Sequence, residues 1–378
     1  MRFSVVIPYR QRLANLRLAL SSLAEQTLPR DEFEVVVGAL DYSPEYTAMC
    51  AGFLDRLDIV SVLSPAPWQV GHARNLALRQ ARGDVIVCLD ADMTVPPGFL
   101  AGLWERHYAY GQRVCVTGQM LDYDNNGSDV AEVTARPWEH YRAQLAALEA
   151  RAAAGDGVRD DPRLGTPHVI PWAYAWTALV AVPRALVEEH GLYFDPEFHG
   201  YGVEDLEWAY RIAATGTPVV MAPDVYGIHL PHARNVAANK ETETRNYRYF
   251  VRKWPGPDTE LAAAFGDFEA NAMAREYRAA LAGAAGPGRS LAVVRSGDRL
   301  WIGAEADAAG GAVTGGPFPA GAETLPLGGV ALPFDDGGMG EVRVLPAVGR
   351  LPARYRDAVL AEARRVAASG TVTEGDAA

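Results

Sequence analysis

Two aspartates stand one residue apart at the point where an apolar segment of the chain stops. Val85–Leu89 is continuously apolar, and Asp90-Ala91-Asp92 follows it directly. Carboxylate oxygens are hard ligands that suit Mg²⁺ or Mn²⁺, and these ions bridge to phosphate oxygens. The alternative is a turn that carries two solvated aspartates. Because the apolar segment is typical of an interior strand, we expect Asp90 to emerge at the ligand-binding edge of a sheet.

A second pair of carboxylates follows a glycine-rich turn. The segment reads His199-Gly200-Tyr201-Gly202-Val203-Glu204-Asp205 and leads into a helical pattern. The helix dipole favours acidic residues in a first turn, which accounts for one carboxylate without any function. The Gly-x-Gly approach suits close passage of the backbone past a ligand, with Gly202 as a candidate sugar contact. Two carboxylates there could divide the work, one holding acceptor hydroxyls and the other removing a proton.

Two histidines, His229 and His232, stand three residues apart after a short predicted strand. Neutral imidazole is a good ligand for Mn²⁺-like ions. A lone histidine is more often a structural residue. The pair, with Asp92 available elsewhere in the chain, favours at least one metal ligand.

Two further polar residues stand next to predicted elements. Asp41 follows the second predicted strand, where a carboxylate could accept the imide N–H of a uracil or thymine ring, or simply form the turn before Ser-Pro. Arg74 stands near the start of a predicted helix, where it could hold a pyrophosphate or a ligand carboxylate. A surface arginine is the alternative.

Three aromatic residues, Trp172, Tyr174 and Trp176, alternate with small residues. In an extended segment this alternation places all three on one side. Aromatic faces pack well against the C–H surfaces of sugars, and packing in the core is the alternative.

The elements that must position these residues alternate along the first part of the chain, which predicts an α/β fold with parallel strands and crossover helices. In such a sheet ligands bind beyond the carboxyl ends of the strands, which selects the Pro8-Tyr9-Arg10 loop, the residues after Val37, and Asp90-Ala91-Asp92. The expected strands are Phe3–Ile7, Glu34–Val37, Ile59–Leu63, Val85–Leu89, Val114–Leu121 and Pro218–Met221. The expected helices are Leu13–Glu25, His72–Arg82, Phe99–Tyr108, Pro137–Arg151 and Val203–Ala214.

The character of the chain changes after about residue 255. We expect a principal domain over 1–255 and a small C-terminal α+β extension over 256–378. Its expected helices are Leu261–Leu281 and Pro352–Ala368, and its expected short strands are Leu291–Ile302, Gly329–Pro333 and Val342–Leu345. This extension could shape an acceptor site or a contact in a homo-oligomer.

The composition is that of an ordinary globular protein of 378 residues, with 49% hydrophobic residues and a formal net charge of −12. The acidic balance and the lack of a dense Lys/Arg block argue against a nucleic-acid partner. No apolar stretch is long enough for a membrane span, and the N-terminus has no apolar signal-peptide core. Three widely spaced cysteines fit a reducing cytoplasm.

The ordered set of motifs resembles the GT-A glycosyltransferases, and within them the inverting family 2. The resemblance covers roughly residues 1–250 and includes similarity to galactosyl-, N-acetylgalactosaminyl- and chondroitin polymerase-type transferases. It rests on the opening strand ending in Pro-Tyr-Arg, the helix of Gly71–Gly83 with its Arg-Asn pair, the Asp90-Ala91-Asp92 strand end and the segment Gly200–Arg211. A departure is the Gly-Ala-Leu-Asp-Tyr-Ser segment, where members often carry adjacent aspartates.

The resemblance implies a fold and a set of roles. The fold would be a Rossmann-like mixed sheet flanked by helices. Asp92 would be the principal metal ligand, with His229 or His232 completing the shell of Mn²⁺ or Mg²⁺, and Asp90 would lie near the ribose or the metal. Asp41 would contact the base and Arg74 the diphosphate or sugar. Asp205 would be the general base and Glu204 a sugar contact.

These observations together predict a metal-dependent, inverting transfer of a sugar from a nucleotide sugar, with a UDP-sugar favoured. The acceptor would be a hydroxyl or amine of a soluble small molecule or glycan, with Trp172, Trp176 and Gly202 as contacts. Two alternatives remain: a sugar nucleotidyltransferase and a non-catalytic glycan-binding module. No Gly-rich loop with a following Lys stands near the N-terminus, which argues against the first.

Overall fold

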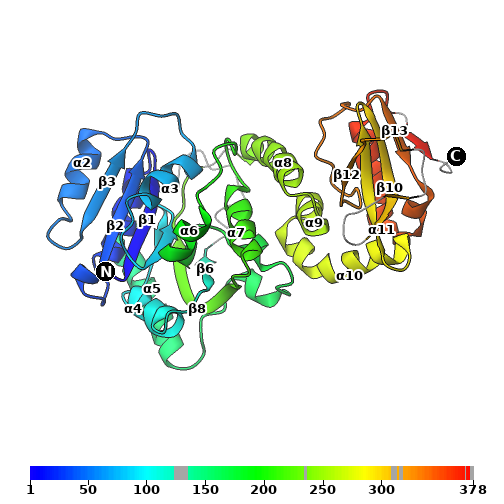
Figure 1. Ribbon diagram of the computed structural model, residues 1–378. Helices are drawn as coiled ribbons and strands as arrows, with labels where there is room; N and C mark the ends of the chain where they lie inside the picture. The colour runs from blue at the N-terminus through cyan, green and yellow to red at the C-terminus, as the bar shows by residue number, and fades with distance from the viewer. Residues whose placement is uncertain (123–134, 234–235, 308–312, 315–317, 371, 375–378) are drawn as a thin grey trace. The chain divides into compact units, whose positions relative to one another are not determined.

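The chain forms two compact units in the computed structural model, which describes residues 1–122, 135–233, 236–307, 313–314, 318–370 and 372–374 (Figure 1). Unit 1 comprises Met1–Gly165 and Pro171–Glu243, and unit 2 comprises Thr166–Ile170 and Thr244–Ala378. Among the described residues, no helix combines the length and the apolar character needed to cross a membrane.

Unit 1 is built on an eight-stranded sheet, counted over the described residues, in the order β3-β2-β1-β4-β7-β6-β8-β5. The strands are β1 (Phe3–Tyr9), β2 (Phe33–Ala39), β3 (Ile59–Leu63), β4 (Val85–Leu89), β5 (Met93–Thr94), β6 (Cys115–Leu121), β7 (Leu179–Pro183) and β8 (Val219–His229). The helices are α1 (Leu13–Leu23), α2 (Pro44–Ala51), α3 (Val70–Leu78), α4 (Phe99–Leu103), α5 (Trp138–Ala153), α6 (Arg184–His190) and α7 (Glu204–Ala214), and α8 (Val236–Lys253) begins in this unit.

The predicted α/β class is confirmed, and the sheet is mixed. Strands β3, β2, β1 and β4 run parallel to their neighbours. Strand β7 then pairs antiparallel with both β4 and β6, while β6 runs parallel to β8. The expectation of parallel strands therefore holds for β3, β2, β1 and β4 and for the β6–β8 pair. It fails at β7, which joins the sheet between β4 and β6 from later in the chain.

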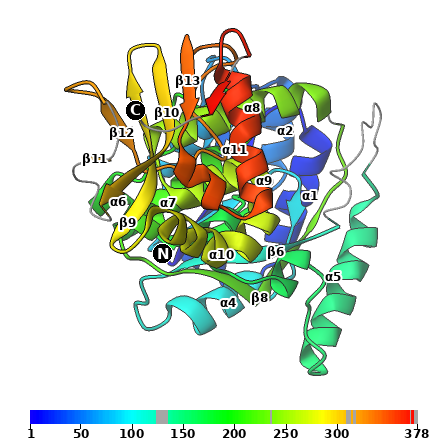
Figure 2. The same ribbon diagram turned by 90° about the vertical axis from the view of Figure 1, so that its right-hand side faces the viewer.

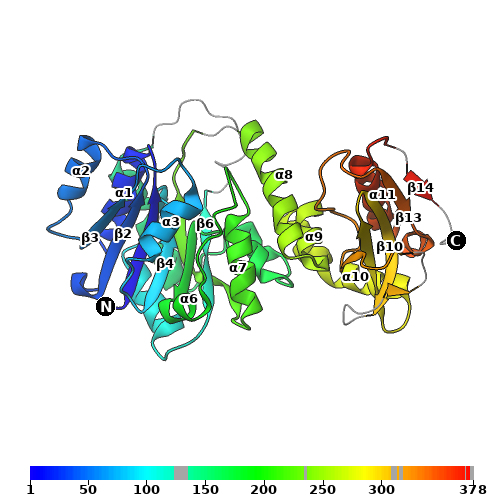
Figure 3. The same cartoon turned by 45° about the horizontal axis from the view of Figure 1, so that its top comes forward.

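The inner strands form because their residues are mostly apolar on both faces, with Ser4, Glu34, Thr117 and Gln119 as buried polar exceptions. Every residue of β1, β2, β4 and β6 is buried. Continuous apolar strands of this kind need helices on both sides, which crossover connections supply. In Figures 1 and 3, α3 lies in front of β1, which it contacts, and Figure 2 shows α1 and α5 side by side.

Close contact between α3 and the sheet depends on Gly38 in β2. A Cβ atom at this position would lie 1.9 Å from the carbonyl oxygen of Ala73. No side chain fits in that space, so glycine allows the backbone of α3 to approach β2 directly. This contact fixes the height of the helix above the sheet one residue before Arg74.

Unit 2 contains a second, six-stranded sheet in its described residues, with the order β12-β9-β10-β13-β14 and β11 paired to β10. The elements are α9 (Pro257–Phe265), α10 (Asp267–Ala285), β9 (Arg289–Ser296), β10 (Arg299–Asp307), β11 (Val313–Thr314), β12 (Glu323–Leu325), β13 (Glu341–Val344), α11 (Ala353–Val366) and β14 (Val372–Glu374). Helix α11 packs beside β13 (Figures 1 and 2).

Several local expectations are wrong. The single strand expected over Leu291–Ile302 is two antiparallel strands, β9 and β10, joined by a turn. The strand expected over Pro218–Met221 continues to His229 as β8. The single helix expected over Leu261–Leu281 is two helices, because Gly266 adopts a φ of 81° that a right-handed helix excludes. The strand expected over Gly329–Pro333 is an irregular segment.

Replacing Gly38 with alanine should destabilise unit 1 by about 2–3 kcal/mol, because the new methyl group must push α3 away from β2. The urea midpoint followed by circular dichroism measures this loss. Gly165→Ala is the matched control, since no atom lies within 4 Å of its added Cβ atom. Equal midpoints for the two variants would contradict the contact.

Candidate functional site

The Asp90-Ala91-Asp92 turn separates its two carboxylates into different environments. Strand β4 ends at Leu89, and the N–H of Asp90 donates to the carbonyl of Ala178 at 3.2 Å. The N–H of Met93 donates back to the carbonyl of Asp90 at 3.0 Å, which closes the turn. The side chain of Asp90 is 31% exposed, whereas that of Asp92 is 3% exposed. The turn therefore sends Asp92 into the protein and leaves Asp90 near its surface.

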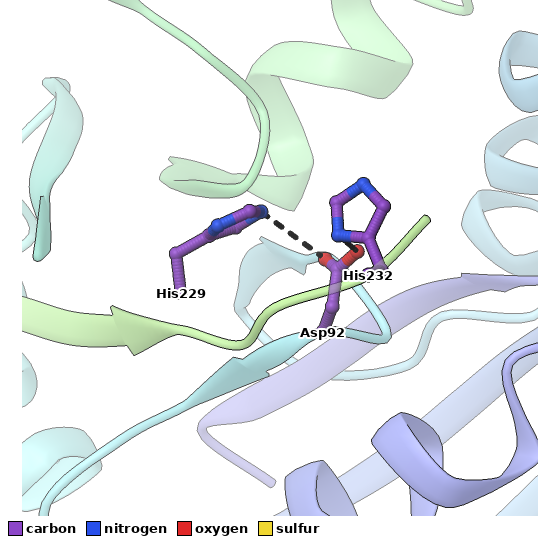
Figure 4. A group of neighbouring side chains, drawn as sticks. All are labelled: Asp92, His229 and His232. Atoms are coloured by element: carbon purple, nitrogen blue, oxygen red, sulfur yellow. Dashed lines mark ion pairs between the residues drawn. The ribbon is translucent and has the colours of Figure 1, made fainter. Parts of the chain in front are cut away.

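Asp92 lies against both histidines (Figure 4). Its Oδ2 is 3.1 Å from Nδ1 of His232, and its Oδ1 is 3.9 Å from Nε2 of His229. One ligand atom from each of these three buried residues lies within 4.8 Å of the others. One carboxylate and two imidazoles form a donor set that suits Mn²⁺ and related ions. The three residues therefore form a candidate metal centre.

Strand pairing explains why residues so distant in sequence meet here. Met93 in β5 pairs with His229 at the end of β8, and the N–H of Leu230 donates to the carbonyl of Asp92 at 2.7 Å. The longer β8 is essential to this arrangement, since it carries His229 to the edge of the sheet at which β4 ends.

A fourth residue, Arg12, joins this centre. Its Nη1 donates to Oδ2 of Asp92 in an ion pair. Arg12 occupies the N-cap position of α1, and the residue before it, Gln11, has a φ of 54°. Arg12 could not be assigned to this centre from the sequence, because nothing in the Pro-Tyr-Arg-Gln-Arg segment distinguishes its role from that of Arg10.

Arg74 connects the Asp90 turn to the start of α7. Its Nη2 donates to Oδ1 of Asp90, and its Nη1 donates to Oε1 of Glu204, both at 2.9 Å. The side chain is 4% exposed. Burial alone would lower the pKa of this guanidinium. The negative charges of Asp90 and Glu204 raise the pKa by more than burial lowers it, so Arg74 stays charged. Arg74 thus binds two carboxylates of its own chain.

The helix that carries Arg74 is fastened to the segment before α7. Asn75 donates to the carbonyl of Phe194 and accepts from its N–H, both at 2.8 Å. The Phe194 ring stacks on Trp208 with centroids 5.0 Å apart, and the guanidinium of Arg74 lies 5.2 Å from the same ring. These contacts hold α3 and α7 in one rigid arrangement.

Helix α7 begins at Glu204 after a backbone of unusual conformation. Val203 is a β-branched residue with a φ of 59°, which costs conformational energy. Gly202 precedes it with a φ of 93°, in the region that glycine alone adopts freely. This strained turn presents Glu204 and Asp205 together at the helix start.

The two carboxylates at the start of α7 differ in their partners. Glu204 is paired with Arg74. Asp205 accepts from the N–H of Leu206 at 2.9 Å, and no side chain in the described part of the chain donates to it. Burial and the adjacent Glu204 raise the pKa of Asp205 toward neutrality, against the opposing effect of Arg74. Such a carboxylate is suited to accept a proton near neutral pH.

The glycines before α7 are also required by packing within unit 1. A Cβ atom at Gly200 would lie 2.7 Å from the Thr242 side chain, and one at Gly202 would lie 3.3 Å from that of Glu243. Thr242 Oγ1 accepts from the N–H of Tyr201 at 3.1 Å. The close approach that the sequence led us to expect for a ligand is therefore made, at Gly200, by the first part of α8.

The loop residues selected on the nucleotide side lie at the ends of two neighbouring strands. Pro8 in β1 pairs with Gly38 in β2, so Pro8-Tyr9-Arg10 and Asp41 leave the same edge of the sheet. Burial raises the pKa of the Tyr9 hydroxyl to about 12, and the negative charge of Asp41 contributes a smaller part of this increase. The guanidinium of Arg10 lies 5.9 Å from the Trp68 ring. Asp41 thus lies near the buried Tyr9, and the exposed Arg10 lies over the half-buried Trp68.

The extended segment expected for the aromatic residues is wrong. Pro171–Tyr174 forms a 3₁₀ helix, so Trp172 and Tyr174 do not share a side through strand alternation. Both are buried, and Trp172 packs edge-on against Tyr210 with centroids 5.5 Å apart. Trp176 is partly buried against the main core.

A buried ion pair that the sequence analysis missed supports Trp176. The side chains of Asp161 and Arg163 are each 1% exposed and lie 2.6 Å apart. Arg163 also donates to the carbonyls of Tyr174 and Gly118, at 2.7 and 2.9 Å. Its guanidinium lies 4.0 Å from the centre of the Trp176 ring. The segment from Gly155 to Pro167 is rich in Gly, Asp and Pro, a composition typical of a loop. Its Asp161–Arg163 pair nevertheless gives Trp176 a rigid support.

Comparisons with known proteins agree with the motifs. Residues 4–155 match the family model described as Glycosyl transferase family 2. The chain is 30% identical over 271 residues to a validoxylamine A glucosyltransferase of Streptomyces hygroscopicus subsp. jinggangensis (strain 5008). That alignment covers 68% of this chain and 62% of the relative, so the chain spans less than two thirds of the relative's length. The predicted resemblance to family 2 is confirmed.

Two solved structures are similar over most of their length. Residues 1–349 of TarS from S. aureus align with a TM-score of 0.48 at 17% identity, covering 72% of each chain. The mannosyltransferase PcManGT from Pyrobaculum calidifontis, in complex with GDP-Man and Mn²⁺, aligns with a TM-score of 0.48 at 20% identity, covering 74% of each chain.

Replacing Arg74 with methionine should reduce stability by about 3–5 kcal/mol, because Asp90 and Glu204 would lose their shared counter-ion within the protein. Denaturant unfolding measures the loss. Arg79→Met at the C-cap of the same helix is the control, since its exposed guanidinium lies over the Tyr193 ring and pairs with no carboxylate of the described residues. A loss no larger than that of the control would show that the Arg74 pairs do not hold the site together.

Proposed function

We propose that this family 2-like glycosyltransferase chain moves a sugar from a nucleoside-diphosphate sugar, with a UDP-sugar favoured, to a hydroxyl or amine of a soluble acceptor. The transfer would be a single displacement with inversion. The observation that carries the proposal is the pairing of Arg74 with both Asp90 and Glu204. This pairing brings two parts of the chain into one site. The Asp90 turn is suited to a donor diphosphate, and the start of α7 is suited to an acceptor.

The cluster of Asp92, His229 and His232 supports a divalent cation, Mn²⁺ or Mg²⁺, as cofactor. The donor set fits, because a carboxylate oxygen and two imidazole nitrogens lie within 4.8 Å of one another. A bound cation would stabilise the negative charge that develops on the leaving diphosphate. The three side chains would hold it away from bulk water, since each is buried.

Asp205 is the residue we assign as general base. Its raised pKa matches a proton acceptor that works near neutral pH, and no side-chain cation pairs with it in the described residues. It would take the proton of the acceptor group as that group bonds to the anomeric carbon and the bond to the diphosphate oxygen breaks. Glu204, held by Arg74, would orient hydroxyls of a sugar.

The nucleotide would lie over the ends of β1 and β2. Pro8, Tyr9 and Arg10 would border it, and Asp41 would accept from the base. Asp90 and Ala91 would face the ribose and diphosphate. We assign Arg74 a positioning role toward the two carboxylates it binds.

The acceptor side is supported by fewer contacts. Trp176 is the proposed aromatic contact, because it is partly exposed while Arg163 holds its ring. Trp172 would act through its packing, and Gly202 would keep the turn before Glu204 open. The name of the validoxylamine A glucosyltransferase supports transfer of a hexose.

A panel of nucleotide sugars with Mn²⁺ tests the proposal through its products. Release of nucleoside diphosphate should accompany transfer, and chelation with EDTA should abolish it. Release of pyrophosphate would indicate a nucleotidyltransferase instead. Thermal shifts with UDP, GDP and dTDP, with and without Mn²⁺, should be largest for UDP with the metal, through linkage between ligand binding and stability. A panel without any turnover would favour a glycan-binding module.

Asp205→Asn should lower kcat by about a thousandfold, within the usual range for loss of a general base, while UDP and Mn²⁺ still shift the melting temperature. In the unmodified chain kcat/KM should fall as the pH drops through the neutral range, because the raised pKa leaves Asp205 protonated there. Glu189→Gln, an exposed position paired with Arg113, is the control. Retention of turnover in Asp205→Asn would assign the base elsewhere.

A further inference from the structure

Arg12 pairs with one of the two carboxylate oxygens of Asp92 in the candidate metal centre. Its Nη1 donates to Oδ2 of Asp92, and the same oxygen is 3.1 Å from Nδ1 of His232. A cation held by Asp92 and His232 would lie close to the guanidinium of Arg12. The two cations would therefore compete for one carboxylate.

Arg12 differs from the other members of the centre in its exposure. Its side chain is 43% exposed, while those of Asp92, His229 and His232 are 3%, 4% and 6% exposed. A long side chain that is nearly half exposed can move its charged end into water at small cost. The buried residues cannot, so Arg12 is the member able to leave.

Charge balance gives the reason for it to leave. Without a cation, the positive charge of Arg12 offsets the negative charge of Asp92. A divalent cation at Asp92 makes the pair positive overall, and a guanidinium at contact distance is then repelled. The repulsion is stronger than in water, because the site is buried.

We propose that Arg12 is a resident counter-ion that competes with the divalent cation for Asp92, so that cation binding and release of Arg12 are one coupled event. This inference rests on the cation site of the proposed function. Arg12 keeps the carboxylate of Asp92 oriented between catalytic cycles, and it lowers the apparent affinity of the site for the metal alone. If Arg12 only positioned Asp92 for the metal, the change in affinity would be in the opposite direction, because removal of Arg12 would then weaken metal binding.

Calorimetric titration with Mn²⁺ alone measures this affinity and so distinguishes competition by Arg12 from a positioning role. Arg12→Met should bind Mn²⁺ about tenfold more tightly than the unmodified chain, because the competing charge is gone. Arg12→Lys, which retains the charge, should stay close to the unmodified chain. Arg10→Met is the matched control, since Arg10 lies over the Trp68 ring and not at Asp92. Equal or weaker binding by Arg12→Met overturns the proposal.

A second measurement needs no variant. Mn²⁺ should increase the rate at which phenylglyoxal modifies Arg12, measured by mass spectrometry of the peptide that contains it, because release exposes the guanidinium. A rate that is unchanged or reduced by Mn²⁺ also overturns the proposal. The unmodified chain could transfer sugar with Mn²⁺ while the affinity of Arg12→Met and the phenylglyoxal rate both stay unchanged. In that case the proposed function stands and this inference fails. If it binds no Mn²⁺, the cation site fails as well.

Discussion

The candidate site depends on one buried guanidinium with two carboxylate partners. Arg74 lies on α3, Asp90 follows β4 and Glu204 begins α7, so a single side chain ties three elements together. An unpaired charge at this depth would be costly, and removing Arg74 would leave both carboxylates without their counter-ion. Gly38 allows α3 to lie close enough to the sheet for this reach. The local backbone and the ionic contacts therefore depend on each other.

The distribution of counter-ions separates the four carboxylates of the site. Asp90 and Glu204 share Arg74, and Asp92 has Arg12. Asp205 has no such side-chain partner in the described residues, so its burial beside Glu204 is offset only in part, and its pKa rises. One acidic group is thus set apart chemically from its neighbours by what surrounds it and not by its own identity.

The sequence predicted the parts that depend on local pattern. The bounds of β3 and β4, the start of α7 near Glu204 and the family all follow from short-range periodicity and ordered motifs. The insertion of β7 between β4 and β6 did not, because strand order depends on contacts distant in sequence. Arg12 and Arg163 were missed for the same reason, since an arginine's partners are invisible until the fold brings them close. The metal, the base and the acceptor contacts remain predictions.

The position of β7 has a consequence for how the molecule can be made. Strand β4 leaves the ribosome early, yet its sheet neighbour β7 begins at Leu179, and the pairing of β5 with β8 waits for His229. The growing chain therefore carries an open sheet edge beside β4 until β7 (Leu179–Pro183) has emerged, and such edges invite pairing with other chains. Nascent chains that stall before β7 would therefore need protection of this edge from aggregation.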